Sequence, residues 1–340
     1  MLNFKVDNNT KLFVKRYDLM QVFFSVLSAV AYLFIIFFVF YVYFLSLPPA
    51  NFPKGKFLFE LKRGESVDDV ASKLQDKHMI KSELLFKIWM RLAYSDKLQA
   101  GDYLFSNPEN LWTISRRFAN GEHGLTPVKI RIQEGWDRRQ IAKTLEKSLL
   151  KFKAEKFLDL SRDKEGYLFP DTYYFLPNIT EQKVLDVMLA NFYKKIAPLS
   201  ADIEKSNLSL DEIVKLASLV EKEASNYKDR RMIAGVLLNR LKIDMPLQVD
   251  ATWIYTHGKG TFGITLKELK DKNNPYNTYV HKGLPPTAIC SPSLSSIKAV
   301  IYPENHNYIF YLADSKGNTY YSKTYKEHLR KKRIYIGEGR

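Results

Sequence analysis

The chain has 340 residues, of which 46% are hydrophobic and 26% charged, so its composition is that of a folded protein and not of a disordered segment. Its formal net charge is +15. Such a charge can serve nucleic-acid binding, but the Lys and Arg residues are scattered beside Asp and Glu. No zinc-finger spacing or aromatic RNA-binding signature accompanies them. We therefore expect no nucleic-acid partner, because an anionic membrane or wall surface explains the charge as well.

Cysteine and histidine usage limits the chemistry further. The single cysteine, Cys290, excludes an intrachain disulfide, and we interpret it as a small packed hydrophobic residue. The six His residues form no H-x-x-x-H pair and no Cys/His cluster. We therefore expect no metal site, and we expect no cofactor.

An uncharged segment runs from Leu19 to Pro53, and residues 22–47 within it are almost wholly apolar. A helix needs about 20 apolar residues to cross a bilayer, so we predict a transmembrane helix over residues 19–47, after a cytoplasmic tail over residues 1–18. A cleaved signal peptide is the rival interpretation. Its apolar core is typically only about 7–15 residues long and ends at a small-residue cleavage site, which this segment lacks.

The numbers of basic residues on the two sides of this helix are equal and do not by themselves determine its orientation in the membrane. Four Lys or Arg residues precede it within 5–16, and four follow it within 54–63. Lys15 and Arg16 lie closest to the span, which favours a cytoplasmic N-terminus.

The segment after the anchor is predicted to form small α/β modules. Ser66 and Asp69 match the S-x-x-[DE] capping box ahead of a helix that starts at Val67. A strand over 56–61 should precede this helix, and a helix over 83–96 and a strand over 98–105 should follow it. Farther on, we expect a strand over 128–132 and a helix over 137–149. The order of strand, glycine turn and helix at 57–74 thus returns at 128–145.

This repeated order of elements resembles the LysM-like module of bacterial wall enzymes. We predict such a module, with its linker, over residues 48–152. It is either plain scaffold or a part that binds glycan.

Residues 153–340 are predicted to form a mixed α+β domain, which makes the fold class α+β with one N-terminal transmembrane helix. We expect a loop rich in aromatic residues over 165–173, and a loop-rich region beyond residue 243. A C-terminal hairpin should join 308–313 to 319–321. The expected helices cover residues 152–163, 181–197, 209–224 and 228–242.

The helix over 209–224 holds the most informative residues. Ser209 and Glu212 match a capping box, and one broad face is apolar. Glu221 and Glu223 fall on the two flanks of that face, where a carboxylate is expensive to place. Either is a simple boundary residue or a partly desolvated general acid with a raised pKa, and helix geometry does not choose between them.

Loops downstream of this helix combine amide, hydroxyl and aromatic groups with rigid Pro and Gly residues. Such groups suit sugar hydroxyls and ring faces, although ordinary structured loops have the same composition. These loops cover residues 246–250, 274–279, 283–286 and 289–292.

Taken in order, these motifs resemble those of the YceG-like endolytic murein transglycosylases, and the resemblance covers nearly the whole chain. Two departures are small: Cys290 stands where the family often has Thr or another small residue, and Ala224 where Thr is common. The matching segments are EGYLFPDTY at 165–173, LASLVEKE at 216–223, NRL at 239–241, LQVD at 247–250, YNTY at 276–279, GLPP at 283–286 and SP at 291–292.

The resemblance implies an enzyme that cuts peptidoglycan strands internally, between N-acetylmuramic acid and N-acetylglucosamine, and leaves a 1,6-anhydromuramic end. It also implies one essential Glu in the Val-Glu-Lys-Glu motif, by position Glu221, which acts as acid and then as base. Other polar residues are expected to bind the substrate in the same groove. These are Glu165, Gln248, Asp250, Tyr276, Asn277, Thr278 and Ser291.

The expected partners follow from the same resemblance: peptidoglycan glycan strands, the membrane, and peptidoglycan synthases (penicillin-binding proteins). A substrate outside the cytoplasmic (inner) membrane would put the N-terminus inside and residues 50–340 outside, on the periplasmic side. Two alternatives stay open. One is a hydrolase of the same bond, with Glu165 or Asp250 as its second carboxylate; the other is a non-catalytic scaffold that binds glycan.

Overall fold

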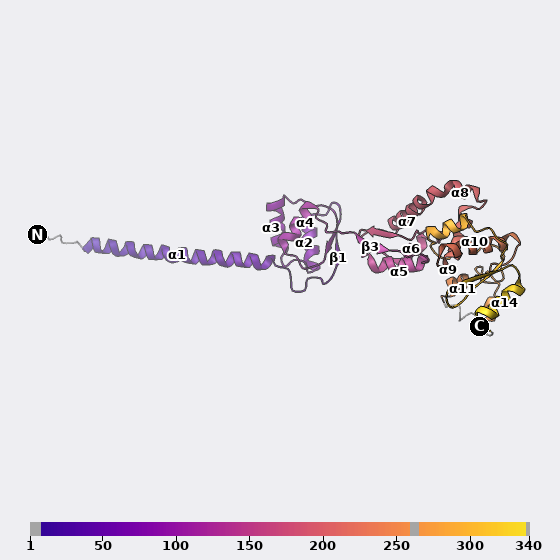
Figure 1. The fold of residues 1–340 in the computed structure, drawn as a ribbon. Helices are drawn as coiled ribbons and strands as arrows, with labels where there is room; N and C mark the ends of the chain where they lie inside the picture. The colour runs from indigo at the N-terminus through magenta and orange to yellow at the C-terminus, as the bar shows by residue number, and fades with distance from the viewer. Residues whose placement is uncertain (1–7, 259–264, 338–340) are drawn as a thin grey trace. The chain divides into compact units, whose positions relative to one another are not determined.

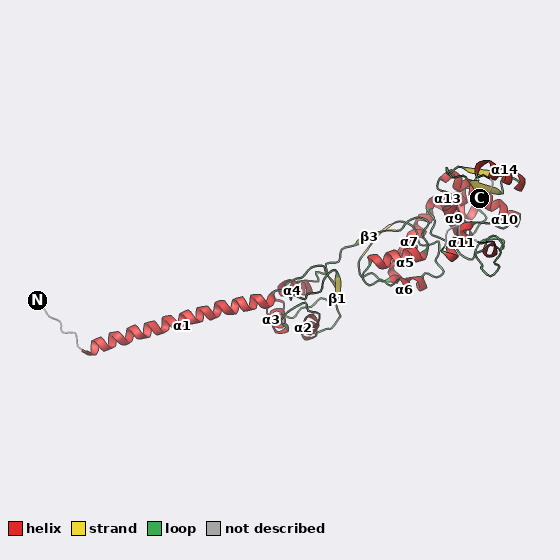
Figure 2. Cartoon of the chain, turned by 90° about the horizontal axis from the view of Figure 1, so that it is seen from below, coloured by secondary structure: helices red, strands yellow, loops and turns green. Residues whose placement is uncertain are grey.

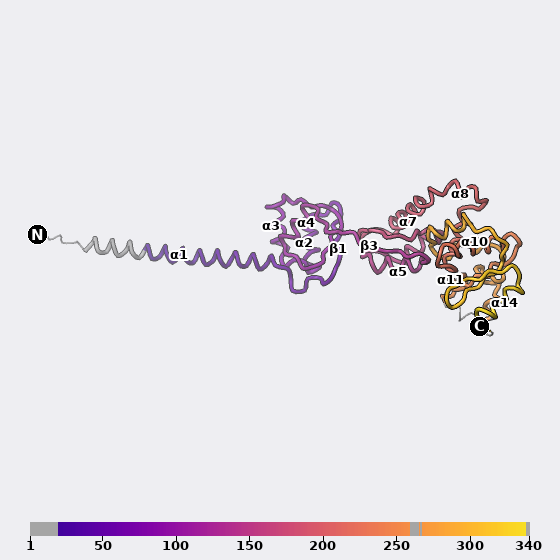
Figure 3. The backbone as a smooth tube through the Cα atoms, in the orientation of Figure 1, coloured from indigo at the N-terminus to yellow at the C-terminus, as the bar shows by residue number. Residues whose placement is uncertain are grey.

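The structure is a computed structural model that describes residues 8–258 and 265–337. It has mixed α+β architecture behind a long apolar helix, which confirms the predicted fold class at that level. The chain divides into two compact units, Met1–Leu125 and Thr126–Arg340. Figures 1 and 2 show the elements of each unit, and Figure 3 traces the backbone.

Helix α1 (Asn8–Ser46) carries the predicted apolar span. Its section Met20–Ser46 is 27 residues long, and none of the side chains in its apolar window is buried. At 1.5 Å per residue this section is about 40 Å long, more than the ~30 Å hydrocarbon core of a bilayer. Among the described residues it is the one helix that is long and apolar enough to cross a membrane.

The first unit continues with a two-stranded antiparallel sheet, in which Phe59 of the first strand faces Tyr103 of the second. Its core is aromatic, and the predicted capping box of Ser66 and Asp69 is confirmed. The elements are β1 (Phe57–Leu61), α2 (Val67–Asp76), α3 (Glu83–Tyr94), β2 (Gly101–Phe105) and α4 (Leu111–Asn120). Helix α4 was not predicted, although its cap Asn110 and the helical spacing of the buried Leu111, Ile114 and Phe118 indicate a helix.

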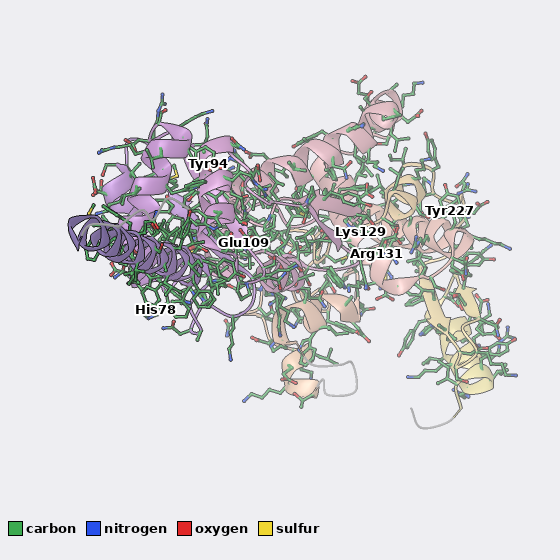
Figure 4. All side chains as sticks on the ribbon, turned by 90° about the vertical axis from the view of Figure 1, so that its left-hand side faces the viewer. His78, Tyr94, Glu109, Lys129, Arg131 and Tyr227 are labelled. Atoms are coloured by element: carbon green, nitrogen blue, oxygen red, sulfur yellow. The ribbon has the colours of Figure 1, made fainter. Side chains whose placement is uncertain are left out.

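The second unit begins with another antiparallel pair, β3 (Val128–Arg131) and β4 (Thr172–Phe175). On β3 the exposed Lys129 and Arg131 (labelled in Figure 4) alternate with the buried Ile130. The prediction of a loop through residue 173 was wrong at its end, because Tyr173 and Phe175 alternate inward as strand residues. The helices here are α5 (Arg138–Ser148), α6 (Ala154–Leu160) and α7 (Glu181–Ile196).

A shared core joins this pair of strands to those helices. It contains Ile130 and Leu145 as well as Phe157 and Met188. Residues 126–152 therefore pack with the second unit, whereas we had expected a domain boundary at 152/153.

The rest of the second unit packs around α9 (Leu210–Glu223), whose residues 213, 214 and 216–220 are all buried. The predicted loop-rich character beyond residue 243 was wrong in part, because short helices occur there; the hairpin was confirmed. The remaining elements are η1 (Ala197–Leu199), α8 (Ser200–Lys205), α10 (Tyr227–Lys242), α11 (Asp250–His257), α12 (Leu266–Leu269), α13 (Leu294–Ile301), β5 (Phe310–Ala313), β6 (Thr319–Ser322) and α14 (Tyr325–Tyr335).

Candidate active site

The C-terminal end of α9 is the point where the motif loops meet. The helix starts with the predicted capping box of Ser209 and Glu212 and ends at Glu223. The loop before α13 is fastened along it: Ser218 Oγ accepts the Ile289 N–H at 3.1 Å, and the Cys290 thiol donates to the Ser218 carbonyl at 3.4 Å. Cys290 is fully buried, which confirms its interpretation as a packed residue.

Glu221 is held in a closed network of side chains. Its Oε1 accepts from the Arg230 guanidinium at 3.0 Å, and its Oε2 accepts from both the N–H and the hydroxyl of Ser293, at 2.8 and 2.6 Å. Arg230 also donates to the Ala224 carbonyl and to Ser293 Oγ, both at 3.1 Å. The Glu221 side chain is only 6% exposed. Its oxygens are therefore occupied in joining the ends of α9, α10 and α13.

A tight turn packs against the Glu221 side chain. Gly135, with φ +76°, lies so close that an added Cβ would be 3.7 Å from Glu221 Cγ. Two backbone hydrogen bonds hold the turn in place: Gly135 N–H to Ser291 O at 2.9 Å, and Ser291 N–H to Trp136 O at 2.8 Å. Ser291 is fully buried and acts here through its backbone.

Glu223 has different surroundings, although only Lys222 separates it from Glu221. It lines a pocket, and its Oε2 accepts from the Tyr311 hydroxyl of β5 at 2.9 Å. Burial raises the pKa of Glu223 to about 7, helped by the negative charge of Asp250 and opposed by the Tyr311 hydrogen bond. Burial and the neighbouring Glu223 also raise the pKa of Tyr311, so this hydroxyl stays a donor.

The pocket beside Glu223 has a volume of about 630 Å³, within the usual range for small-ligand sites. Its walls come from α5, from the end of α9 and from α11. Most of the lining residues carry polar or charged side chains, beside the apolar Ala251, Ile254 and Ile289, and this mixture suits the hydroxyls and ring faces of a sugar. The polar and charged residues are Asp137, Arg139, Gln140, Lys143, Lys222, Glu223, Asp250 and Tyr255.

Two of the predicted groove residues lie at the start of α11. Asp250 lines the pocket and is hydrogen-bonded by the Tyr279 hydroxyl. Gln248 is exposed and has a left-handed backbone with φ +52°, which is uncommon for a residue other than glycine. Its side-chain oxygen accepts from Arg240 at 3.3 Å. Arg240 also donates to the carbonyls of Leu247 and Ile309, and so ties this loop to the hairpin that carries Tyr311.

Glu165 lies behind the pocket wall and is 3% exposed. It accepts from the Arg138 N–H at the start of α5 at 3.2 Å, and from the Tyr255 hydroxyl of α11 at 3.1 Å. Burial and the charge of Asp137 raise the pKa of Glu165 to about 7, against these two hydrogen bonds. Glu165 therefore positions Tyr255, which itself lines the pocket.

The other predicted binding residues have framework contacts. The Asn277 amide donates to three carbonyls of residues 268–271, and the Thr278 hydroxyl accepts the Val249 N–H at 2.9 Å. Both residues are 3% exposed, so their burial indicates that they shape the loop from within. Tyr276 is half-buried; its ring lies 5.3 Å from that of Tyr255, and its hydroxyl pairs with Thr287 at 2.8 Å.

Comparison with known proteins gives this geometry a context. The chain matches the YceG-like family over residues 59–334, which is most of its length. It belongs to that family. The resemblance seen in the sequence motifs is thereby confirmed.

Relatives of this YceG-like chain include a Bacillus subtilis (strain 168) protein named endolytic murein transglycosylase. It is 31% identical over 300 residues, which cover 80% of this chain and 83% of the relative. A protein of the same name from Streptococcus pneumoniae serotype 2 (strain D39) is 31% identical over 91% of this chain, which spans only 63% of that relative. The crystal structure of a YceG-like protein from Listeria monocytogenes matches with a TM-score of 0.54 and 30% identity, over 81% of this chain and 98% of that one.

Several site residues of this YceG-like chain were not predicted from its sequence. Arg230, Tyr311 and Arg139 gave no signal, because their contacts with the site depend on tertiary packing. Tyr255 was not among the residues predicted to bind the substrate. No group of three or more His, Cys, Asp or Glu within the described ranges is placed to hold a metal ion.

Proposed function

We propose that this chain is a lytic transglycosylase that cuts peptidoglycan strands internally and leaves 1,6-anhydromuramic ends. One observation carries the proposal: the partly buried carboxyl of Glu223 lines a pocket at the end of α9 together with a second carboxylate, Asp250, and desolvation there raises the pKa of Glu223 to about 7. A general acid works best when its pKa lies near the working pH. Membership of the YceG-like family supports the same reaction, as do its relatives named endolytic murein transglycosylase.

Glu223 is the better candidate for the essential acid, although the family resemblance had pointed to Glu221. The Glu221 side chain is only 6% exposed, and its two oxygens accept hydrogen bonds from Arg230 and Ser293, so neither is free to reach a glycosidic bond. Glu223 lines the pocket, and the Tyr311 hydroxyl donates a hydrogen bond to one of its two oxygens. The assignment to Glu221 remains a prediction with weaker support.

The reaction needs one such group. Protonated Glu223 donates its proton to the oxygen that links muramic C1 to the next sugar, and the C1–O bond breaks. The resulting carboxylate then takes the proton from the muramic C6 hydroxyl as that oxygen bonds to C1. No water is consumed, and the tethered hydroxyl has the advantage of proximity.

Two neighbours assist in this scheme. The Tyr311 hydroxyl, which donates to Oε2, fixes the orientation of the Glu223 carboxyl. Asp250 is a second carboxylate of the pocket, and its negative charge would stabilise the positive charge that develops at C1 in the transition state.

Hydrolysis of the same bond is the second candidate, because Asp250 lines the pocket with Glu223 and could activate a water molecule. Hydrolysis would add one water to each product, and transglycosylation adds none. Glu165 is a poorer second carboxylate, since it lies behind Tyr255.

The finer cellular assignments are part of the same proposal. Helix α1 is a retained single-pass anchor in the cytoplasmic membrane, with the N-terminus inside, and the first unit contains a LysM-like module. The catalytic domain then acts on nascent strands outside that membrane, near peptidoglycan synthases. The length and composition of α1 support an anchor but carry no information on its direction.

The deciding experiment uses full-length protein and purified glycan strands, with mass spectrometry of the products. We expect Glu223→Gln to lose at least about 100-fold of the rate at which anhydro ends form, and to keep its fold. Glu221→Gln is the matched control on the same helix. It should lose about 3 kcal/mol of stability because Arg230 is left unpaired, yet its folded fraction should still form anhydro ends.

Full activity of Glu223→Gln would overturn the assignment of the acid. Products that are heavier by one water would show that the enzyme is a hydrolase and not a lytic transglycosylase. If the wild type bound glycan strands without cleaving them, the non-catalytic glycan-binding scaffold would be the remaining hypothesis.

A further inference from the structure

Helix α3 carries large aliphatic side chains on its outer face. Leu84 is 68% exposed, Ile88 47% and Leu92 77%. Their spacing of four residues places them in one stripe along the helix. The opposite face is a normal core face, with Phe86 and Met90 fully buried. An ordinary surface helix would have polar residues in the outer stripe, so this face is apolar without a partner among the described residues.

The start of α3 is fastened to the end of α1. Lys81, just before the cap Ser82, donates from Nζ to the Phe44 carbonyl at 3.0 Å, and its ammonium lies 3.8 Å from the centre of the Phe44 ring. Figures 1 and 2 both show α3 at the edge of the first unit from which α1 leaves. The outer stripe therefore begins within a few residues of the membrane-spanning segment.

The connection between α1 and the unit is also short. Helix α1 ends at Ser46, and Phe52 is already 4% exposed in the core of the unit, where its ring contacts Phe57 and Phe105. Because only residues 47–51 lie between α1 and the core of the unit, the unit must stay close to the membrane surface at which α1 emerges.

Basic side chains border the stripe. Lys87 pairs with Asp68 and Glu83, and the Arg91 side chain is 79% exposed with one weak partner, Asp96, at 3.4 Å. Long basic side chains beside an apolar stripe are typical of helices that lie in a membrane interface, where the charged ends reach the headgroups.

We infer that the stripe Leu84–Ile88–Leu92 lies in the boundary between lipid headgroups and acyl chains of the membrane that α1 enters. A lipid surface is the occupant that the fold already brings to this face, through the Lys81–Phe44 contact and the short connection. The consequence is a second, parallel attachment that would fix the orientation of the first unit on the membrane. The inference rests on α1 being a retained anchor.

The experiment uses the full chain in vesicles of phosphatidylglycerol and phosphatidylcholine. A nitroxide label is placed on Ile88→Cys, and in a second protein on Leu92→Cys; the native Cys290 is buried and escapes labelling. Collision of the label with oxygen, which concentrates in lipid, is compared with collision with a water-soluble nickel chelate. Lys62→Cys, exposed just after β1, is the aqueous control, and Tyr32→Cys, exposed midway along the apolar span, is the lipid control.

We expect the ratio of oxygen to nickel collisions at residues 88 and 92 to be several-fold higher than at residue 62, and to approach that at residue 32. A ratio at 88 and 92 equal to that at 62, with residue 32 in lipid, overturns the inference and leaves the anchor intact. Low collision with both reagents would mean that protein covers the face, and spin–spin broadening would identify a second copy; either overturns the inference. An aqueous residue 32 overturns the anchor and the inference together.

Discussion

Glu221 and Glu223 are separated by one residue, so their side chains leave α9 about 200° apart. One direction leads into the Arg230–Ser293 network and the other into the pocket. The two carboxylates therefore do different work, one joining three helices and the other available for proton transfer. This division depends on Arg230, Ser293 and Tyr311, none of which is near in sequence.

The raised pKa of Glu223 predicts how activity depends on pH. The acid must be protonated, so the rate of anhydro-end formation should be flat below about pH 6 and fall about tenfold per unit above its pKa of about 7. Glu165→Gln is the control, because Glu165 also has a pKa of about 7 but lies behind Tyr255. The falling limb should survive in that variant. A rate that rises from pH 7 to 9 would exclude Glu223 as the acid.

The same shift predicts a stability effect of defined sign. The pKa of Glu223 is raised in the folded state, so its contribution is fully present below the unfolded value of 4.5 and is lost as pH rises through about 7. Glu223→Gln cannot ionise. We expect it to match the wild type at pH 4.5 and to be more stable at pH 8, by up to about 3 kcal/mol.

Thermal unfolding in detergent at the two pH values, followed by circular dichroism, would measure this difference. A variant less stable than the wild type at pH 8 would show that burial of the ionised Glu223 carboxylate does not destabilise the folded state.

At the scale of elements, the loop before β4 owes its shape to Gly166. This residue has φ +90°, and an added Cβ would lie 2.6 Å from both Ala288 and Val214. Real Cβ contacts are never so short, so the loop would have to move, and with it the adjacent Glu165. In the Glu-Gly pair of the sequence motif, Gly166 thus allows the backbone to pack closely against Ala288 and Val214, and this packing holds the buried Glu165 in place.

Gly166→Ala should therefore cost about 1–3 kcal/mol beyond the strain of its backbone, and should lower activity because Glu165 no longer holds Tyr255. Gly317→Ala is the matched control: it has φ +82° in the β5–β6 turn, but no atom within 4 Å of the added Cβ. Unfolding and product formation would be measured on both variants. Equal effects would mean that strain alone, and not the contact with Ala288 and Val214, explains Gly166.

Elements with strong local signals could be predicted from the sequence. The capping boxes at Ser66 and Ser209 located α2 and α9, and the apolar run located α1. Helices α11 and α13 were missed, because each has only eight residues and lies among segments rich in Pro and Gly. Such short helices are stabilised by tertiary packing more than by their own sequence.

At the scale of the whole molecule, the sequence order of motifs identified the family but could not assign tasks within the site. Asn277, Thr278 and Ser291 were expected to bind the ligand because their side chains are polar. Their burial, and their contacts with neighbouring backbone groups, indicate that they support the loops instead. A polar residue in a loop motif cannot be assigned to ligand or framework until its neighbours in space are known.

The way α1 joins the first unit bears on where a protease could separate the two. Proteases cut where several residues are exposed and loosely held. Between the buried Ser46 and the buried Phe52 only Ala50 and Asn51 are exposed, whereas Lys54, Gly55 and Lys56 form an exposed run just before β1. A protease that needs several consecutive exposed residues would therefore find them at 54–56, beyond Phe52, and not in the short connection directly after α1.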